Sequence, residues 1–124
     1  MPPTHVAIDR PADRLLVDRV ELLSGWVRGG DGEFGLAAAC GARPVVVRQC
    51  WHPDARSTAD LRGFWGFVVV QELLGEARDR VLAIDLAWNG TRIETLHLRL
   101  SPAAEHLARE YPLNLAAYPV PAAP

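Results

Sequence analysis

The sequence predicts an all-β protein: an antiparallel β-sandwich, immunoglobulin-like or jelly-roll-like, with a short C-terminal helix. Three observations lead to this prediction. The 124-residue chain has the length of one domain. Six segments have the alternation or the apolar content of strands, and turn-forming residues separate them at intervals of about ten residues. A strong helix-start signal follows the last of these segments.

The chain is expected to have three parts. Residues 1–17 mix proline and charged residues with one short apolar triplet, so we expect a loose arm that becomes ordered as it meets the domain. Residues 18–111 hold the predicted strands and helix and form the β-sandwich domain. Residues 112–124 contain four prolines and cannot continue a helix. This Pro-rich tail either docks on the domain through its tyrosines and leucines or links it to something else.

The first predicted strand, residues 20–28, alternates apolar and polar side chains like a half-buried strand. Val20, Leu22 and Trp26 share its apolar side. We therefore expect Trp26 in the core. Gly-Gly-Asp-Gly at residues 29–32 follows and predicts a turn.

The middle of the chain predicts three further strands. Residues 33–40 and 44–51 form the first two, and the second begins at Pro44 because proline has no N–H for the strand ladder. Residues 63–71 are apolar at both odd and even positions. This pattern predicts a central strand that is covered on both faces, with Trp65 in the core.

A β-hairpin is predicted near the end of the domain. Residues 80–88 and 91–100 are its strands, and Asn-Gly between them is a strong hairpin signal. A simple two-residue loop would place apolar residues of one strand opposite polar residues of the other. We therefore expect either a three-residue loop that begins at Trp88 or a bulge near Ile93. We also expect Trp88 to be at least partly exposed.

The pattern changes after Leu100. Ser101 is a good N-cap and Pro102 a favourable first-turn residue, so a short helix is expected to about Glu110. A shorter helical turn is expected at residues 71–77.

Composition excludes several functional classes. Thirteen basic and fifteen acidic side chains give a net charge of −2, so we expect no nucleic-acid partner. No apolar run approaches the roughly 20 residues that cross a bilayer, and the N-terminus lacks the pattern of a secretory signal. Cys40 and Cys50 are awkwardly placed for a disulfide, so free, partly buried thiols are expected. A reducing, cytoplasmic location follows from these expectations.

The loop after residue 50 is the candidate binding site. A flat indole offers an apolar face to the C–H side of a sugar ring, while polar neighbours bind hydroxyl groups. The predicted ligand-binding residues are Trp51, His52, Asp54, Arg56, Arg62 and Trp88. The competing interpretation is that these charged side chains only pair with each other in water. In addition, the aspartate after Pro53 favours a turn.

No catalytic, metal or cofactor site is predicted. The four histidines are scattered and lack the spacing of paired metal ligands. Neither the serines nor the cysteines carry a local signature of an activated nucleophile. Carboxylate-pair chemistry at Asp54 and Asp60 stays open, but two acids on one loop do not specify it. The glycine-rich turn at residues 29–32 lacks the strand-to-helix context of a phosphate-binding loop.

Three short motifs occur in order: Ser24-Gly25-Trp26-Val27, Pro53-Asp54, and Gly66-Phe67 before a valine-rich strand. This order resembles the small β-sandwich accessory domains found beside bacterial glycosyltransferases and other polysaccharide enzymes. In that family pattern the loop reads Arg-Pro-Asp-Val, whereas here His52 replaces the arginine and Ala55 the valine. The resemblance spans roughly the first to the last predicted strand. It implies a non-catalytic module that works in glycan handling.

We therefore expect a binding or accessory module, not an enzyme, whose ligand is a glycan. The alternative is a structural subunit of a phage-like particle or multiprotein assembly, in which the Pro-rich ends contact neighbouring subunits. In that case the partner is another protein subunit, and a homo-oligomer is possible. A small enzyme is a third hypothesis, which a polar pocket with a strongly perturbed acid or base would favour.

Overall fold

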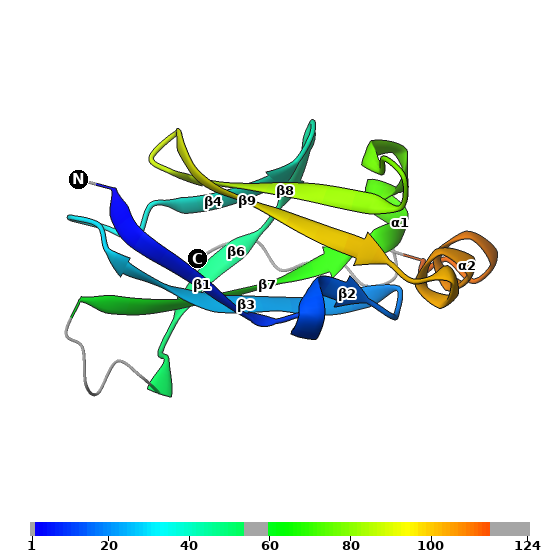
Figure 1. Cartoon of the computed structure of the whole chain (residues 1–124), viewed down its shortest axis with the longest axis horizontal. Helices are drawn as coiled ribbons and strands as arrows, with labels where there is room; N and C mark the ends of the chain where they lie inside the picture. Colours follow the sequence, from blue (N-terminus) through cyan, green and yellow to red (C-terminus); the bar gives the residue numbers. More distant parts are fainter. Residues whose placement is uncertain (1, 54–59, 115–124) are drawn as a thin grey trace.

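The computed structural model describes residues 2–53 and 60–114. Two β-sheets pack face to face, and a helix lies at one end (Figure 1). The four-stranded sheet has the order β1-β3-β7-β6, and the five-stranded sheet has the order β2-β9-β8-β4-β5. The predicted all-β sandwich with a short C-terminal helix is confirmed.

In chain order the elements are β1 (Pro3–Arg10), the 3₁₀ turn η1 (Ala12–Arg14), β2 (Leu15–Leu16), β3 (Val20–Gly29), β4 (Leu36–Cys40), β5 (Arg43–Val45), β6 (Val47–Cys50), β7 (Leu61–Val69), α1 (Val70–Leu73), the 3₁₀ turn η3 (Leu74–Glu76), β8 (Val81–Trp88), β9 (Thr91–Leu100) and α2 (Pro102–Glu110). The helical turn expected at residues 71–77 corresponds to α1 and η3.

The N-terminal segment is part of the sandwich, in contrast to the loose arm expected for residues 1–17. β1 pairs antiparallel with β3, and Val6 lies opposite Val27. Val6 and Ile8 pack against the core. Only two inward-facing apolar side chains alternate along β1, which is too short a pattern to indicate a strand among the prolines and charges around it.

The core lies between the two sheets. Its fully buried side chains come from both sheets and from the segments that join them. They include Leu16, Leu23, Val27, Phe64, Val68, Val70, Leu82, Ile84, Leu86 and Leu98.

Trp26 is not in this core, so its predicted position is wrong. β3 directs Leu23 and Val27 inward, where both are fully buried. Trp26 is half-buried on the opposite, outer face of the sheet. β3 carries apolar side chains on both faces, and periodicity alone cannot show which of two apolar faces meets the other sheet.

β7 occupies a central position between β3 and β6, as predicted. Its inner face contributes Phe64 and Val68 to the core. Its outer face is not covered, because Phe67 is 51% exposed and Trp65 is only half-buried. The predictions of a strand covered on both faces and of a core position for Trp65 are therefore wrong.

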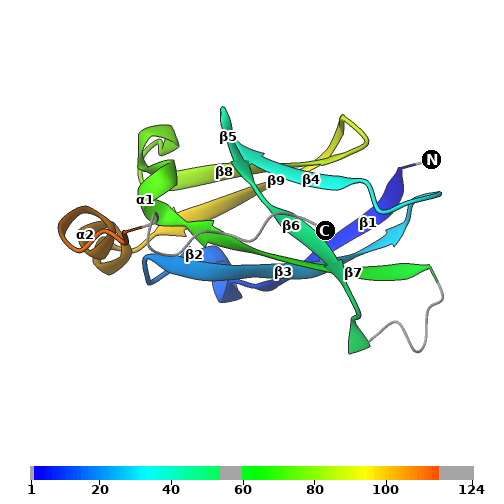
Figure 2. The same ribbon diagram turned by 180° about the vertical axis from the view of Figure 1, so that it is seen from behind.

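The predicted strand at residues 44–51 is two strands in different sheets. β5 pairs with β4 in the five-stranded sheet, whereas β6 pairs with β7 in the four-stranded sheet. Figure 2 shows β5 and β6 as one diagonal segment that crosses from sheet to sheet. On the opposite side of the sandwich, η1 carries the chain from β1 in one sheet to β2 in the other. Each side of the sandwich is thus crossed by one segment.

The β8–β9 hairpin has a two-residue loop and a bulge at Ile93. Leu86 lies opposite Glu94 and Ala87 opposite Arg92, so Ile93 is the extra residue. The predicted bulge is confirmed, and the three-residue loop is wrong. The bulge shifts the register so that apolar residues of both strands face the core. Trp88 is only 4% exposed, which contradicts its predicted exposure.

The C-terminal helix begins as the sequence predicts. The Ser101 hydroxyl oxygen accepts the backbone N–H of Ala104 at 3.0 Å, which is the expected capping bond. Beyond the helix, Leu113 donates its backbone N–H to the Gln71 side chain at 2.6 Å and accepts from it at 3.0 Å. The tail therefore docks on the domain at least as far as Leu113. The rest of it, residues 115–124, lies outside the described residues.

Both cysteines are free thiols, and Cys40 is buried while Cys50 is half-buried, as predicted. They lie in different sheets, in β4 and β6. Burial raises the pKa of both thiols, and the nearby Glu76 and Asp85 carboxylates raise that of Cys40 further. Within the described ranges, no helix is long and apolar enough to cross a membrane.

Candidate functional site

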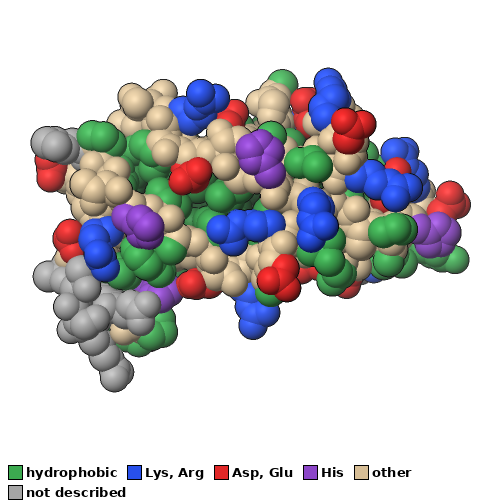
Figure 3. Space-filling model, viewed as in Figure 1, with side chains coloured by type: hydrophobic (Ala, Val, Ile, Leu, Met, Phe, Trp, Pro, Cys, Tyr) green, Lys and Arg blue, Asp and Glu red, His purple; other side chains and the backbone are tan. Residues whose placement is uncertain are grey.

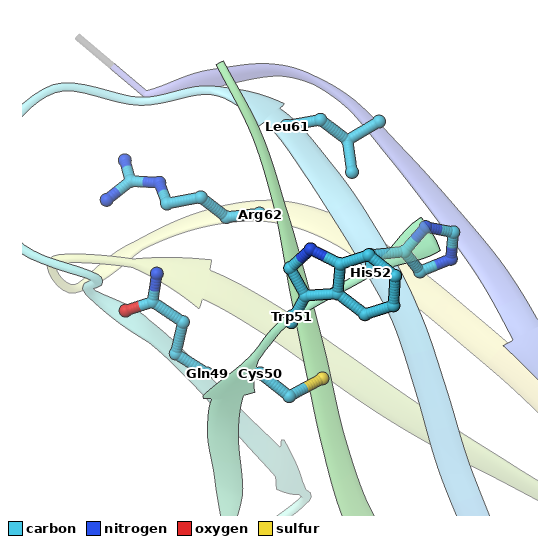
Figure 4. Close-up of a pocket in the computed structure, with 6 residues that line it drawn as sticks. All are labelled: Gln49, Cys50, Trp51, His52, Leu61 and Arg62. Carbon is cyan, nitrogen blue, oxygen red and sulfur yellow. The ribbon is translucent and has the colours of Figure 1, made fainter. Parts of the chain in front are cut away.

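A hollow of about 390 Å³ lies where β6 ends beside the start of β7. Its lining residues are Gln49, Cys50, Trp51, His52, Leu61 and Arg62. In Figure 4 the Trp51 indole stands in front of β7, with Gln49 and Arg62 extending to one side and Leu61 and His52 to the other. The hollow therefore combines one indole ring with several polar groups.

Trp51 is the most exposed large apolar residue described, at 64%. The β6–β7 ladder ends at Cys50 and Gly63, so the chain leaves the sheet directly before Trp51. An indole that follows the last paired residue of an edge strand is held by a rigid sheet and still faces solvent. This placement suits a binding residue.

The His52 side chain points away from Trp51 and connects the loop to β1. Its Nε2 atom lies 2.7 Å from Asp9 Oδ2. Its ring also meets the Trp26 ring edge-on at 6.4 Å, and His5 lies 5.2 Å from the same indole. The His52 side chain is only 15% exposed. These contacts give His52 a structural role on the outer face of the four-stranded sheet, beside its place in the hollow.

Arg62 shares the inner side of β7 with Phe64 and reaches the end of the sandwich. It donates to the backbone carbonyls of Gly30 and Gly32, the latter at 3.0 Å. Its guanidinium carbon lies 5.1 Å from the centre of the Trp88 ring. Arg62 thereby joins β7 to the turn after β3 and covers a buried tryptophan.

Arg62→Ala is expected to destabilise the protein by about 2 kcal/mol, because two carbonyls lose a charged donor and Trp88 loses its cover. Urea unfolding monitored by circular dichroism measures the change. Arg92→Ala removes an exposed arginine that makes no such contact with the described residues, and should stay within about 0.5 kcal/mol of wild type. Equal effects of the two substitutions would contradict the role assigned to Arg62.

The structure divides the six predicted ligand-binding residues. Trp51, His52 and Arg62 line one hollow. Trp88 does not line it and is buried beneath Arg62, so the structure does not bring it together with the other three. Asp54 and Arg56 lie outside the described residues.

Sequence reasoning missed Gln49, Cys50 and Leu61 as lining residues. All three precede or follow the loop on strands β6 and β7, whose pairing brings the loop ends together. The predicted strand boundaries place these residues beside the loop. Only the pairing of β6 with β7 shows that they line the same hollow.

Two observations on the described residues concern metal binding and thiol reactivity. Among them, no three His, Cys, Asp or Glu side chains are grouped so that they could hold a metal ion. The raised pKa of the Cys50 thiol leaves it protonated at neutral pH and therefore weakly nucleophilic.

A second surface feature is an apolar patch on the outer face of the four-stranded sheet. Leu22 lies opposite Phe67 in the β3–β7 ladder, and these side chains are 39% and 51% exposed. The Trp65 ring meets the Phe67 ring edge-on at 5.6 Å. We refer to Leu22, Trp65 and Phe67 as the outer patch.

The hollow beside Trp51 is therefore the candidate site, and the outer patch is a separate surface feature. No protein-family model, curated protein or solved structure matches the chain in comparisons with known proteins.

Proposed function

We propose that the chain is a non-catalytic accessory module that binds a glycan at the hollow beside Trp51. The observation that supports this proposal best is an indole that is 64% exposed next to polar side chains. Sugar rings have an apolar C–H face and a polar rim, so they suit a flat aromatic ring with hydrogen-bonding groups beside it.

The polar neighbours have the required donors and acceptors. The Gln49 amide can both donate to and accept from hydroxyl groups. A guanidinium has more N–H donors than the two that Arg62 gives to backbone carbonyls. Under this proposal Trp51 stacks on one sugar ring while Gln49 and Arg62 bind its hydroxyl groups.

Trp51→Ala is expected to weaken glycan binding by about tenfold or more, because the stacking surface is lost. An array of bacterial polysaccharides identifies a ligand, and calorimetric titration then measures affinity for wild type and variant. Phe67→Ala removes another exposed aromatic side chain, which lies in the outer patch and away from the hollow, and should leave the affinity unchanged.

Two results would contradict the glycan proposal. One is that wild type binds no polysaccharide on the array. The other is that Trp51→Ala and Phe67→Ala weaken binding equally, which would point to non-specific contact with exposed aromatic rings.

The outer patch favours a second candidate function, that of a structural subunit in a multiprotein assembly. Contiguous exposed apolar side chains on a soluble protein often mark contact surfaces. Size-exclusion chromatography with light scattering tests this alternative on wild type, on Phe67→Ser and on a chain without residues 112–124. A wild-type oligomer that either change converts to monomer supports the assembly role. A wild-type monomer at high concentration counts against self-assembly through this patch.

A further inference from the structure

A second hollow, of about 320 Å³, lies between β1 of one sheet and β9 of the other. In the view shared by Figures 1 and 3, apolar surface is recessed between charged side chains in this region. Val6, Ile8 and Leu96 supply apolar lining. We call this feature the β1–β9 groove. Its volume is at the lower end of the roughly 300–1,000 Å³ typical of ligand sites.

One wall of the groove is an open strand edge. On one side β9 pairs with β8 from Thr91 to Arg99, apart from the bulge at Ile93. On its other side β2 covers only Arg99 and Leu100. Among the described residues no strand pairs with this second side of β9 at residues 91–98. The segment before β2 does not continue along this edge, because β1 lies in the other sheet and η1 joins it to β2. Alternate N–H and C=O groups of β9 therefore face the groove.

We propose that the β1–β9 groove binds an extended peptide, which adds to β9 as a further strand in line with β2. A series of N–H and C=O groups at strand spacing is matched by another peptide backbone. Every second side chain of the peptide then enters the apolar space between Val6, Ile8 and Leu96. β2 already uses the same edge of β9 in parallel pairing, so the geometry of such an addition exists in this fold.

The parallel pairing of β2 gives the direction of the peptide, and the charges along the groove then determine its composition. Glu94 lines the end of the groove near the start of β9, and Arg14 lines the end near β2. Arg14 also approaches the Ile8 carbonyl at 3.5 Å, which keeps its side chain over the groove. A peptide parallel to β9 places its first residue near Glu94 and its last near Arg14. The preferred ligand is therefore a segment of about five residues with a basic residue first, alternating apolar residues, and an acidic residue last.

Selection from a displayed library of random heptapeptides on the full chain tests the proposal. Selected peptides should share the basic–apolar–acidic order. Glu94→Lys should replace the basic preference at the first position by an acidic one and weaken the original peptide by at least tenfold. Glu110→Lys makes the same charge change on exposed α2 and should leave selection and affinity unchanged. Arg14→Glu should reverse the preference at the last position.

Hydrogen exchange locates the peptide, since added-strand pairing should protect amides within residues 91–98. Trp51→Ala should retain peptide binding, because Trp51 lies in the other hollow. The proposal is overturned if no peptide is selected, if Glu94→Lys and Arg14→Glu leave the selected sequences unchanged, or if protection appears outside β9.

Discussion

Gly25→Ala is expected to destabilise the protein by about 3 kcal/mol or more, one of the two largest effects predicted for a single methyl group in this chain. A Cβ atom on residue 25 would lie 2.0 Å from the Ala7 carbonyl oxygen and 3.1 Å from Ile8 Cα. Both atoms belong to the backbone of β1, so no side-chain rotation relieves the clash. β1 would have to move away from β3, and Val6 and Ile8 would lose their contacts with the core.

Urea unfolding of wild type and Gly25→Ala measures this effect. Gly75→Ala is the matched control, because nothing lies within 4 Å of a Cβ atom at that position. The control should be neutral or slightly stabilising, since alanine lowers the entropy of the unfolded chain. If Gly25→Ala stayed within 1 kcal/mol of Gly75→Ala, β1 could not lie as close to β3 as the structure places it.

Local signals in the sequence predicted much of the fold correctly. Ser101 and Pro102 indicate the start of α2 because a helix cap depends on neighbouring residues only. Asn89 and Gly90 form the loop of the expected hairpin. Of the two predicted ways to match its apolar faces, the bulge near Ile93 is confirmed and the three-residue loop is wrong. These features depend on residues within a few positions of each other, which a sequence displays directly.

The errors concern features that depend on distant parts of the chain. The alternation of β3 predicts Trp26 in the core, because Trp26 shares one side with Val20 and Leu22. The opposite side carries Leu23 and Val27, and only the position of the other sheet decides which side is buried. Trp88 is buried because Arg62, from another strand and sheet, covers its ring. The sequence predicts a loose N-terminal arm and not a strand, because β1 is stabilised by its pairing with the distant strand β3. Such pairings leave little trace in the local pattern.

The sequence predicts only part of the candidate site, because the rest of the site also depends on distant parts of the chain. Trp51 is a predicted ligand-binding residue at the end of a predicted strand, and in the structure its side chain is exposed. His52 was expected to face a ligand, but its pairing with Asp9 joins residues that are 43 positions apart. Gln49 lines the hollow because β6 pairs with β7, and the local sequence pattern does not show this pairing. The sequence therefore located the loop, whereas the strand register determined its lining.

The second large effect is expected for Gly66→Ala, which should destabilise the protein by about 3 kcal/mol. A Cβ atom here would lie 2.3 Å from the Val46 carbonyl oxygen and 3.1 Å from Val47 Cγ1. Val46 joins β5 to β6 where the chain crosses between the sheets. Its carbonyl can approach β7 only because residue 66 has no side chain.

Gly66→Ala should also affect the hollow beside Trp51, because β6 carries Gln49 and leads directly into the loop. In the folded fraction, amides of β6 should exchange faster than in wild type while those of β8 keep their protection, and glycan affinity should fall with them. Gly25→Ala acts on the opposite edge of the sheet, so its folded fraction should keep more of that affinity.

This difference follows from the positions of the two glycines. Gly25 belongs to the Gly-Trp motif and Gly66 to the Gly-Phe motif, which are two of the motifs that resemble accessory domains. Each leaves room for a backbone carbonyl, at β1 for Gly25 and at the β5–β6 crossing for Gly66. If both variants lost stability but neither changed exchange at β6, the close approach at Val46 would not be what positions the binding loop.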